Sequence, residues 1–129
     1  VALRFALGRH LRWLAELPWL LHGTVDGRDW YAVHAGFDDG PLAPQVAELG
    51  RCDERLRRKV IEQPAPLYAK QRSFLVPCDL PADACVISGH TPQQAALVSP
   101  SRILCDTSGG QRGRPLSAVR FPDGRVVTS

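Results

Sequence analysis

The chain has 129 residues, of which 44% are hydrophobic, and a formal net charge of +3. This length fits one domain, residues 1–129, that buries about two thirds of its unfolded surface. No stretch approaches the ~20 apolar residues needed to span a bilayer. The basic run of Arg55, Arg57, Arg58 and Lys59 has acidic neighbours and indicates a solvated helix face, not a nucleic-acid patch. We therefore expect a folded, cytoplasmic protein that binds neither membranes nor nucleic acid.

Helical signals occur in the first half of the chain. Leu11, Leu14 and Leu17 recur at helical spacing, and the proline that follows them ends the pattern. A second, short helix is predicted over 41–50, closed by its last glycine. A third is predicted over 53–63, because apolar residues lie on one side of it and charge on the other. The prolines after it predict an irregular connection.

Strand signals dominate the rest of the sequence. Asp26-Gly27 is typical of a tight hairpin turn and predicts a hairpin between 24–25 and 28–34. In its second strand, Trp30, Ala32 and His34 share one face. Two or three helices beside a set of hairpin-linked strands predict a mixed α/β fold with one covered sheet. Further strands are predicted over 84–88, 95–98, 102–105, 116–121 and 125–128.

Two histidines stand out because each follows an apolar, strand-like run and sits at a turn. The run 30–33 leads into His34 and Gly36, and the run 84–87 leads into His90 and Pro92. A side chain at the end of a strand can project into a crevice, and neutral imidazole is the commonest side-chain metal ligand. The pair therefore predicts half of a metal site, in which the two imidazoles lie within about 5 Å of each other at the same edge of the sheet. The alternative is a pair of hydrogen-bonded structural histidines, since no His-x-x-x-His or Cys-x-x-Cys occurs.

The four cysteines have no metal-ligand spacing. Cys85 and Cys105 lie in apolar strand-like runs, where small buried thiols are ordinary. A domain with this apolar content does not need disulfides. We therefore expect Cys52, Cys78 and the two strand cysteines to be reduced and structural.

Several short motifs appear in an order that resembles a known family. They are Val33-His34-Ala35-Gly36-Phe37, Pro41-Leu42 with Gln45, Val86-Ile87-Ser88-Gly89-His90-Thr91-Pro92-Gln93, Ile103-Leu104-Cys105-Asp106-Thr107 and Leu116-Ser117-Ala118-Val119. This set resembles the C-terminal half of calcineurin-like metallophosphoesterases. It is most similar to the branch of bacterial-type serine/threonine protein phosphatases and diadenosine tetraphosphatases. The resemblance extends from about Leu11 to Val126.

The resemblance implies a fold and a missing part. The family fold is a four-layer α-β-β-α sandwich, of which this chain would be the second sheet with its helices. The family's N-terminal motifs, Gly-Asp-x-His-Gly, Gly-Asp-x-x-Asp-Arg-Gly and Gly-Asn-His-Asp/Glu, do not occur in this sequence. We therefore expect a C-terminal portion without its N-terminal metal-binding half. The sheet face left apolar would be covered by that half or by a second copy in a homodimer.

The resemblance also implies a chemistry and roles for four residues. The family hydrolyses phosphoesters with two divalent metal ions (Mn, Fe or Zn), which activate water for attack on phosphorus. His34 and His90 match two histidine ligands of one of these ions. Arg72 resembles the arginine that grips the substrate phosphate, although a plain surface charge is the alternative. Asp106 matches a carboxylate that forms a turn or supports the ligands without binding the metal itself.

Three functional readings follow from the sequence. The first, which we favour, is a piece of a metal-dependent phosphatase that is inactive without its other half. The second is a non-catalytic interaction module that keeps the fold. The third is a single-metal or metal-free protein that binds an anion through His34, His90 and Arg72. Phosphoproteins and dinucleotide polyphosphates are both possible substrates.

Overall fold

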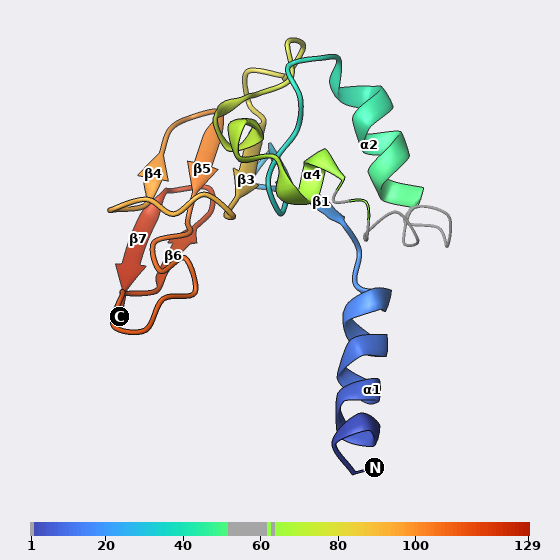
Figure 1. Cartoon of the computed structure of the whole chain (residues 1–129). Helices are drawn as coiled ribbons and strands as arrows, with labels where there is room; N and C mark the ends of the chain where they lie inside the picture. The colour runs from blue at the N-terminus through green and yellow to red at the C-terminus, as the bar shows by residue number, and fades with distance from the viewer. Residues whose placement is uncertain (1, 52–61, 63) are drawn as a thin grey trace.

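A computed structural model describes residues 2–51, 62 and 64–129 of the chain. Within these residues the fold is mixed α/β, with three α-helices, a five-stranded mixed sheet and a two-stranded sheet (Figure 1). None of the helices described is long and apolar enough to cross a membrane. The elements are α1 (Ala2–Glu16), β1 (Leu20–Val25), β2 (Arg28–Val33), α2 (Leu42–Arg51), α4 (Ala65–Tyr68), the 3₁₀ helix η2 (Lys70–Phe74), β3 (Cys85–Ser88), β4 (Leu97–Val98), β5 (Arg102–Leu104), β6 (Ser117–Arg120) and β7 (Arg125–Thr128).

The five-stranded sheet has the order β1-β2-β3-β5-β4. Its three central strands, β2, β3 and β5, are parallel, whereas β1 and β4 pair antiparallel at the two edges. Parallel neighbours need crossover connections, which here are the segments 34–84 and 89–101. The prediction of a mixed α/β fold is confirmed. The expectation that hairpins link the strands holds only for β1–β2, β4–β5 and β6–β7.

The first hairpin forms where the sequence predicts it. Asp26 and Gly27 have φ angles of 51° and 74°, as a two-residue turn with both central residues in the left-handed region requires. The first strand is longer than predicted, since β1 begins at Leu20, which pairs with Val33. The two-residue turn fixes the register of β1 against β2. Strand β1 is longer than predicted because it pairs with β2 along its whole length.

One face of the sheet carries the core. Leu20, Val33 and Val86 pack there with Phe37 and with the buried leucines of α2. The opposite face is apolar but less covered. Its neighbouring strand residues Leu21, Ala32 and Ile87, which we call the open face, include a leucine that is 55% exposed. Helix α1 extends away from both sheets (Figure 1).

Three helix predictions have different outcomes. The pattern of leucines before Pro18 is confirmed by α1. The prediction that Gly50 closes the second helix is wrong, because α2 includes Gly50 and extends to Arg51, the last described residue before position 62. Packing of this helix on the sheet outweighs the low helix propensity of a single glycine. The helix predicted over 53–63 lies outside the described residues, except for residue 62.

The segment predicted to be irregular is helical. Pro64 is the N-cap of α4 and Pro66 lies in its first turn, where a missing N–H costs nothing. The 3₁₀ helix η2 follows directly and carries Arg72 and Ser73. These two short helices lie beside the carboxyl ends of β2 and β3, and Ala35 donates its amide hydrogen to the carbonyl oxygen of Pro66 over 2.8 Å.

Candidate metal site

Three of the predicted site residues lie just beyond the carboxyl ends of adjacent parallel strands. His34 directly follows β2, His90 comes two residues after β3, and Asp106 comes two residues after β5. The carboxyl ends of parallel strands meet at one edge of a sheet, where ligand sites of open α/β sheets usually form. The topology therefore brings together residues that are separated by as many as 72 positions in the sequence.

The two histidine rings face each other at this edge. His34 Nε2 lies 3.0 Å from His90 Nδ1, and the ring centroids are 4.9 Å apart with an interplanar angle of 62°. The prediction that the rings approach within about 5 Å is confirmed. Two nitrogens bound to one ion at about 2.1 Å, with an angle of 90–110° between the bonds, are about 3.0–3.4 Å apart. The observed separation fits one shared ion, and it equally fits a direct hydrogen bond between the two rings, so both readings of the pair stay open.

A main-chain contact determines which nitrogen of His90 faces His34. His90 Nε2 lies 2.9 Å from the carbonyl oxygen of Tyr68. A carbonyl oxygen only accepts, so Nε2 carries the hydrogen and Nδ1 presents its lone pair toward His34. Metal-binding histidines are commonly oriented in this way, through a hydrogen bond from the second ring nitrogen. His90 also adopts a φ angle of 65°, which is uncommon outside glycine and is often found at functional sites.

The surroundings of His34 favour its neutral form. Burial lowers the pKa of His34 most, the neighbouring His90 lowers it further, and the charge of Asp106 raises it by less, so the net direction is down from 6.5. Neutral imidazole is the form that binds a metal ion. The ring is therefore already uncharged at neutral pH, but the hydrogen that His34 Nε2 donates to His90 Nδ1 has to move to Nδ1 of His34 before Nε2 can bind an ion.

Asp106 has a turn-forming role. Its Oδ1 accepts a 2.7 Å hydrogen bond from the amide of Gly109, which closes the turn after β5. Its charge acts on His34 from this position. Among the residues that the structure describes, no group of three or more histidine, cysteine, aspartate or glutamate side chains is arranged to hold a metal.

An open cavity of about 590 Å³ lies beside the histidine pair. His34 and Tyr68 line it together with all three residues of the open face. Leu14 and other residues at the end of α1 and the start of β1 line it as well. The cavity is mainly apolar, so a ligand there would meet hydrophobic surface on one side and the imidazole edge on the other.

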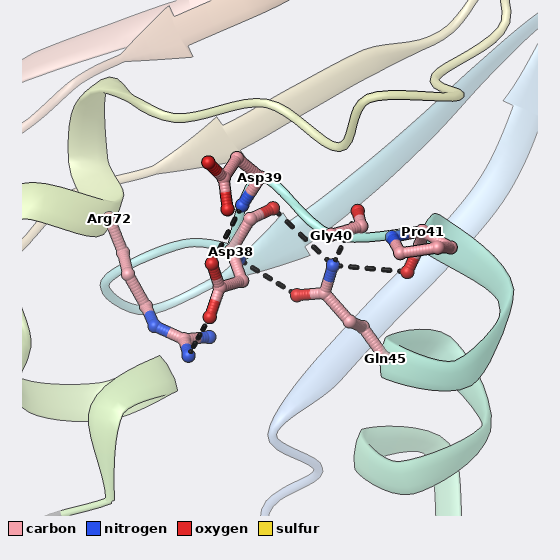
Figure 2. A network of polar contacts seen from close by, with 6 residues as sticks. All are labelled: Asp38, Asp39, Gly40, Pro41, Gln45 and Arg72. Carbon is pink, nitrogen blue, oxygen red and sulfur yellow. Dashed lines mark hydrogen bonds and ion pairs between the residues drawn. The ribbon is translucent and has the colours of Figure 1, made fainter.

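Arg72 lies in a different place. It lines a second cavity, of about 430 Å³, and its guanidinium forms a 2.8 Å ion pair with Asp38. Figure 2 shows how Gln45 of α2 holds the Asp38 loop: its Oε1 accepts from the Asp38 amide at 2.7 Å, and its Nε2 donates to the carbonyl oxygens of Asp38, Gly40 and Pro41. The structure does not bring Arg72 into the cavity of the histidine pair. Its phosphate-binding role stays a prediction.

Three cysteines are described, and all three are free thiols. Burial raises the pKa of Cys85 and of Cys105, so both are protonated and unreactive at neutral pH. Cys78 is exposed, and Cys52 lies outside the described residues. For Cys85 and Cys105 the expected structural role is confirmed.

Comparison with known proteins assigns no family to the chain. No protein-family model matches the chain, and no curated protein matches it either. Sequence reasoning missed Tyr68 and Ser73, which contact the two histidine turns. No local signal could identify them, since one contributes a main-chain oxygen and the other a hydroxyl from a distant segment.

Proposed function

We propose that the chain is the histidine-bearing part of a metal-dependent phosphoesterase of the calcineurin-like kind. In this proposal residues 1–129 correspond to the C-terminal half of a four-layer α-β-β-α sandwich. The observation that carries the proposal is the 3.0 Å separation of His34 Nε2 from His90 Nδ1, at the carboxyl ends of two adjacent parallel strands. The bond from His90 to Tyr68 supports it, because it leaves the facing nitrogen unprotonated.

The chemistry follows from what these side chains can hold. A divalent ion (Mn, Fe or Zn) bound there would polarise a phosphoryl oxygen and activate water. His34 and His90 each contribute one nitrogen, whereas such ions take four to six ligands. The remaining ligands, and those of a second ion, would come from a partner segment and from the substrate. For Arg72 to bind the substrate phosphate, its guanidinium would have to leave Asp38 and the separate cavity that it lines, and a phosphate would have to compete with that carboxylate.

A second candidate function is a non-catalytic interaction module. The open face supports it, since Leu21 is 55% exposed and the neighbouring cavity is mainly apolar. Apolar patches of this kind commonly mark contacts with other polypeptides. The partner would be the metal-binding half of the sandwich or a second copy of this chain.

Metal binding tests the proposal directly. Calorimetric titration of the purified chain with Mn²⁺ and with Zn²⁺ should reveal one ion per chain. Both His34→Ala and His90→Ala should weaken binding by at least about tenfold, because each removes one of two ligands. The matched control is His10→Ala, since His10 is an exposed histidine on α1. Binding that is equal in the wild type and in both site variants would contradict the proposal.

A further inference from the structure

A cluster of buried polar side chains lies beneath the two turns that carry the histidines. Ser73 has no exposed surface, Arg102 is 6% exposed and Ser88 is also buried. They come from η2, β5 and the end of β3. A buried polar group is costly unless it is hydrogen-bonded, so the contacts of this cluster indicate what it stabilises.

The hydroxyl of Ser73 contacts both histidine turns. Its Oγ lies 3.2 Å from the carbonyl oxygen of Ala35, which follows His34. It also lies 3.4 Å from the carbonyl oxygen of Gly89 and 2.8 Å from Thr91 Oγ1, on either side of His90. Either hydroxyl can donate in the Ser73–Thr91 bond, since Thr91 Oγ1 also lies 3.3 Å from the carbonyl oxygen of Lys70. When Thr91 donates to Ser73, the hydroxyl proton of Ser73 is shared between the carbonyl oxygens of Ala35 and Gly89.

Arg102 of β5 binds the main chain of Ser73 and so holds this residue in place. Its Nε donates a 2.8 Å hydrogen bond to the carbonyl oxygen of Ser73, and its Nη2 donates at 2.5 Å to Ser88 Oγ, at the end of β3. Its Nη1 is buried with no hydrogen-bond partner among the described residues. Burial lowers the pKa of Arg102 to about 10. No carboxylate pairs with Arg102 in the part of the chain that the structure describes, and burying an unpaired cation does not by itself stabilise a fold. Its bonds do hold η2 against the strand that leads to His90.

We propose that Ser73 is a positioning residue for the histidine pair, which sets the separation of His34 Nε2 from His90 Nδ1 by binding both turns at once. The inference rests on the proposed metal-binding function of that pair. Ser73 itself touches neither ring. It acts through the carbonyl oxygens of Ala35 and Gly89 and through Thr91, each of which is adjacent to a histidine in the chain.

The test compares Ser73→Ala with Ser117→Ala. Ser117 is a matched control because its Oγ also forms two side-chain hydrogen bonds, with Thr107 Oγ1 at 2.9 Å and with Thr128 Oγ1 at 3.1 Å, but it lies in β6 of the two-stranded sheet. Calorimetric Zn²⁺ affinity of the full chain should fall about 10–100-fold in Ser73→Ala and remain unchanged in Ser117→Ala. Nitrogen NMR of the metal-free protein supplies the second readout. The His34 Nε2 resonance should move toward that of an unbonded ring in Ser73→Ala only.

The two readouts separate this inference from the proposed function. A wild-type chain that binds no metal contradicts the function, whereas the NMR shift of His34 still tests Ser73. Unchanged metal affinity together with an unchanged NMR spectrum in a folded Ser73→Ala would overturn the inference. If Ser73→Ala does not fold, the same two measurements on Thr91→Val and Thr91→Ser test the inference instead. The valine, which lacks the hydroxyl, should reproduce the loss, and the serine should restore wild-type binding. Equal behaviour of the two Thr91 variants would also overturn it.

Discussion

The amide of Gly89 donates a 3.1 Å hydrogen bond to the carbonyl oxygen of His34. This bond continues the parallel pairing of β2 and β3 beyond the ends of both strands. It brings His34 beside the residue that precedes His90. The main chain thus sets the register of the two histidines, and the contacts of Tyr68 and Ser73 set the orientation and spacing of their rings.

The first prediction concerns pH. His34 should titrate below 6.5 in the metal-free protein, because burial and then His90 lower its pKa. As the pH falls, the His34 ring is protonated near pH 6.5 in the unfolded chain and only at a lower pH in the folded chain. The free energy of unfolding should therefore decrease as the pH falls through 6.5. Above 6.5 both states are neutral and the effect disappears. Proton NMR of the His34 ring measures the midpoint.

Two variants check the causes of this shift. His90→Ala should raise the pKa of His34 toward 6.5, since it removes a neighbour that lowers it. Asp106→Asn should lower the pKa further, because the charge that raises it is lost while an acceptor remains for the Gly109 amide. A wild-type midpoint at or above 6.5 would contradict the prediction.

The second prediction concerns the turn after His34. Gly36 has a φ angle of 131°, and a Cβ there would lie 2.4 Å from the carbonyl oxygen of Arg72. Gly36→Ala should therefore destabilise the protein by about 2–4 kcal/mol in urea unfolding. Gly40→Ala is the control, because its Cβ would meet only Gln45 Nε2 at 3.9 Å. It should change stability by less than about 1 kcal/mol. Similar losses in both variants would show that the close approach is not the cause.

Local signals predicted much of the fold. The Asp26-Gly27 turn and the leucine pattern of α1 are encoded within a few residues, and both are confirmed. The parallel order of β2, β3 and β5 could not be read from local pattern, because it depends on crossovers of many residues. The helices α4 and η2 escaped prediction since the prolines, read as breakers, instead begin a helix.

The site was predictable in part for a similar reason. His34 and His90 carry a local signature, a strand followed at once by a turn, and their approach is confirmed. The residues that orient these histidines carry no local sequence signature. The carbonyl oxygen of Tyr68, for example, could come from any residue type. Residue type alone singles out Arg72 in the sequence. Its ion pair with Asp38 depends on the loop that Gln45 holds, which is a tertiary effect.

The third prediction concerns activity. This chain of 129 residues should not hydrolyse p-nitrophenyl phosphate or diadenosine tetraphosphate in the presence of Mn²⁺. Two histidines cannot hold a pair of ions, because each ion takes four to six ligands. Initial rates with and without Mn²⁺ are the measurement. Robust hydrolysis that is lost in His90→Ala would show that the chain carries a complete active site.

The last prediction concerns association. We expect a homodimer at micromolar concentration, because Leu21 of the open face is 55% exposed and Leu11 and Trp13 of α1 are also exposed. At about 25 cal/mol per Å² of apolar surface, covering several hundred square ångströms would offset much of the free-energy cost of association. Leu21→Ser should shift sedimentation equilibrium toward the monomer, whereas Leu116→Ser should not, since Leu116 is 67% exposed but lies outside the five-stranded sheet. A wild-type chain that sediments as a monomer and binds no hydrophobic dye would show that the open face needs no second copy.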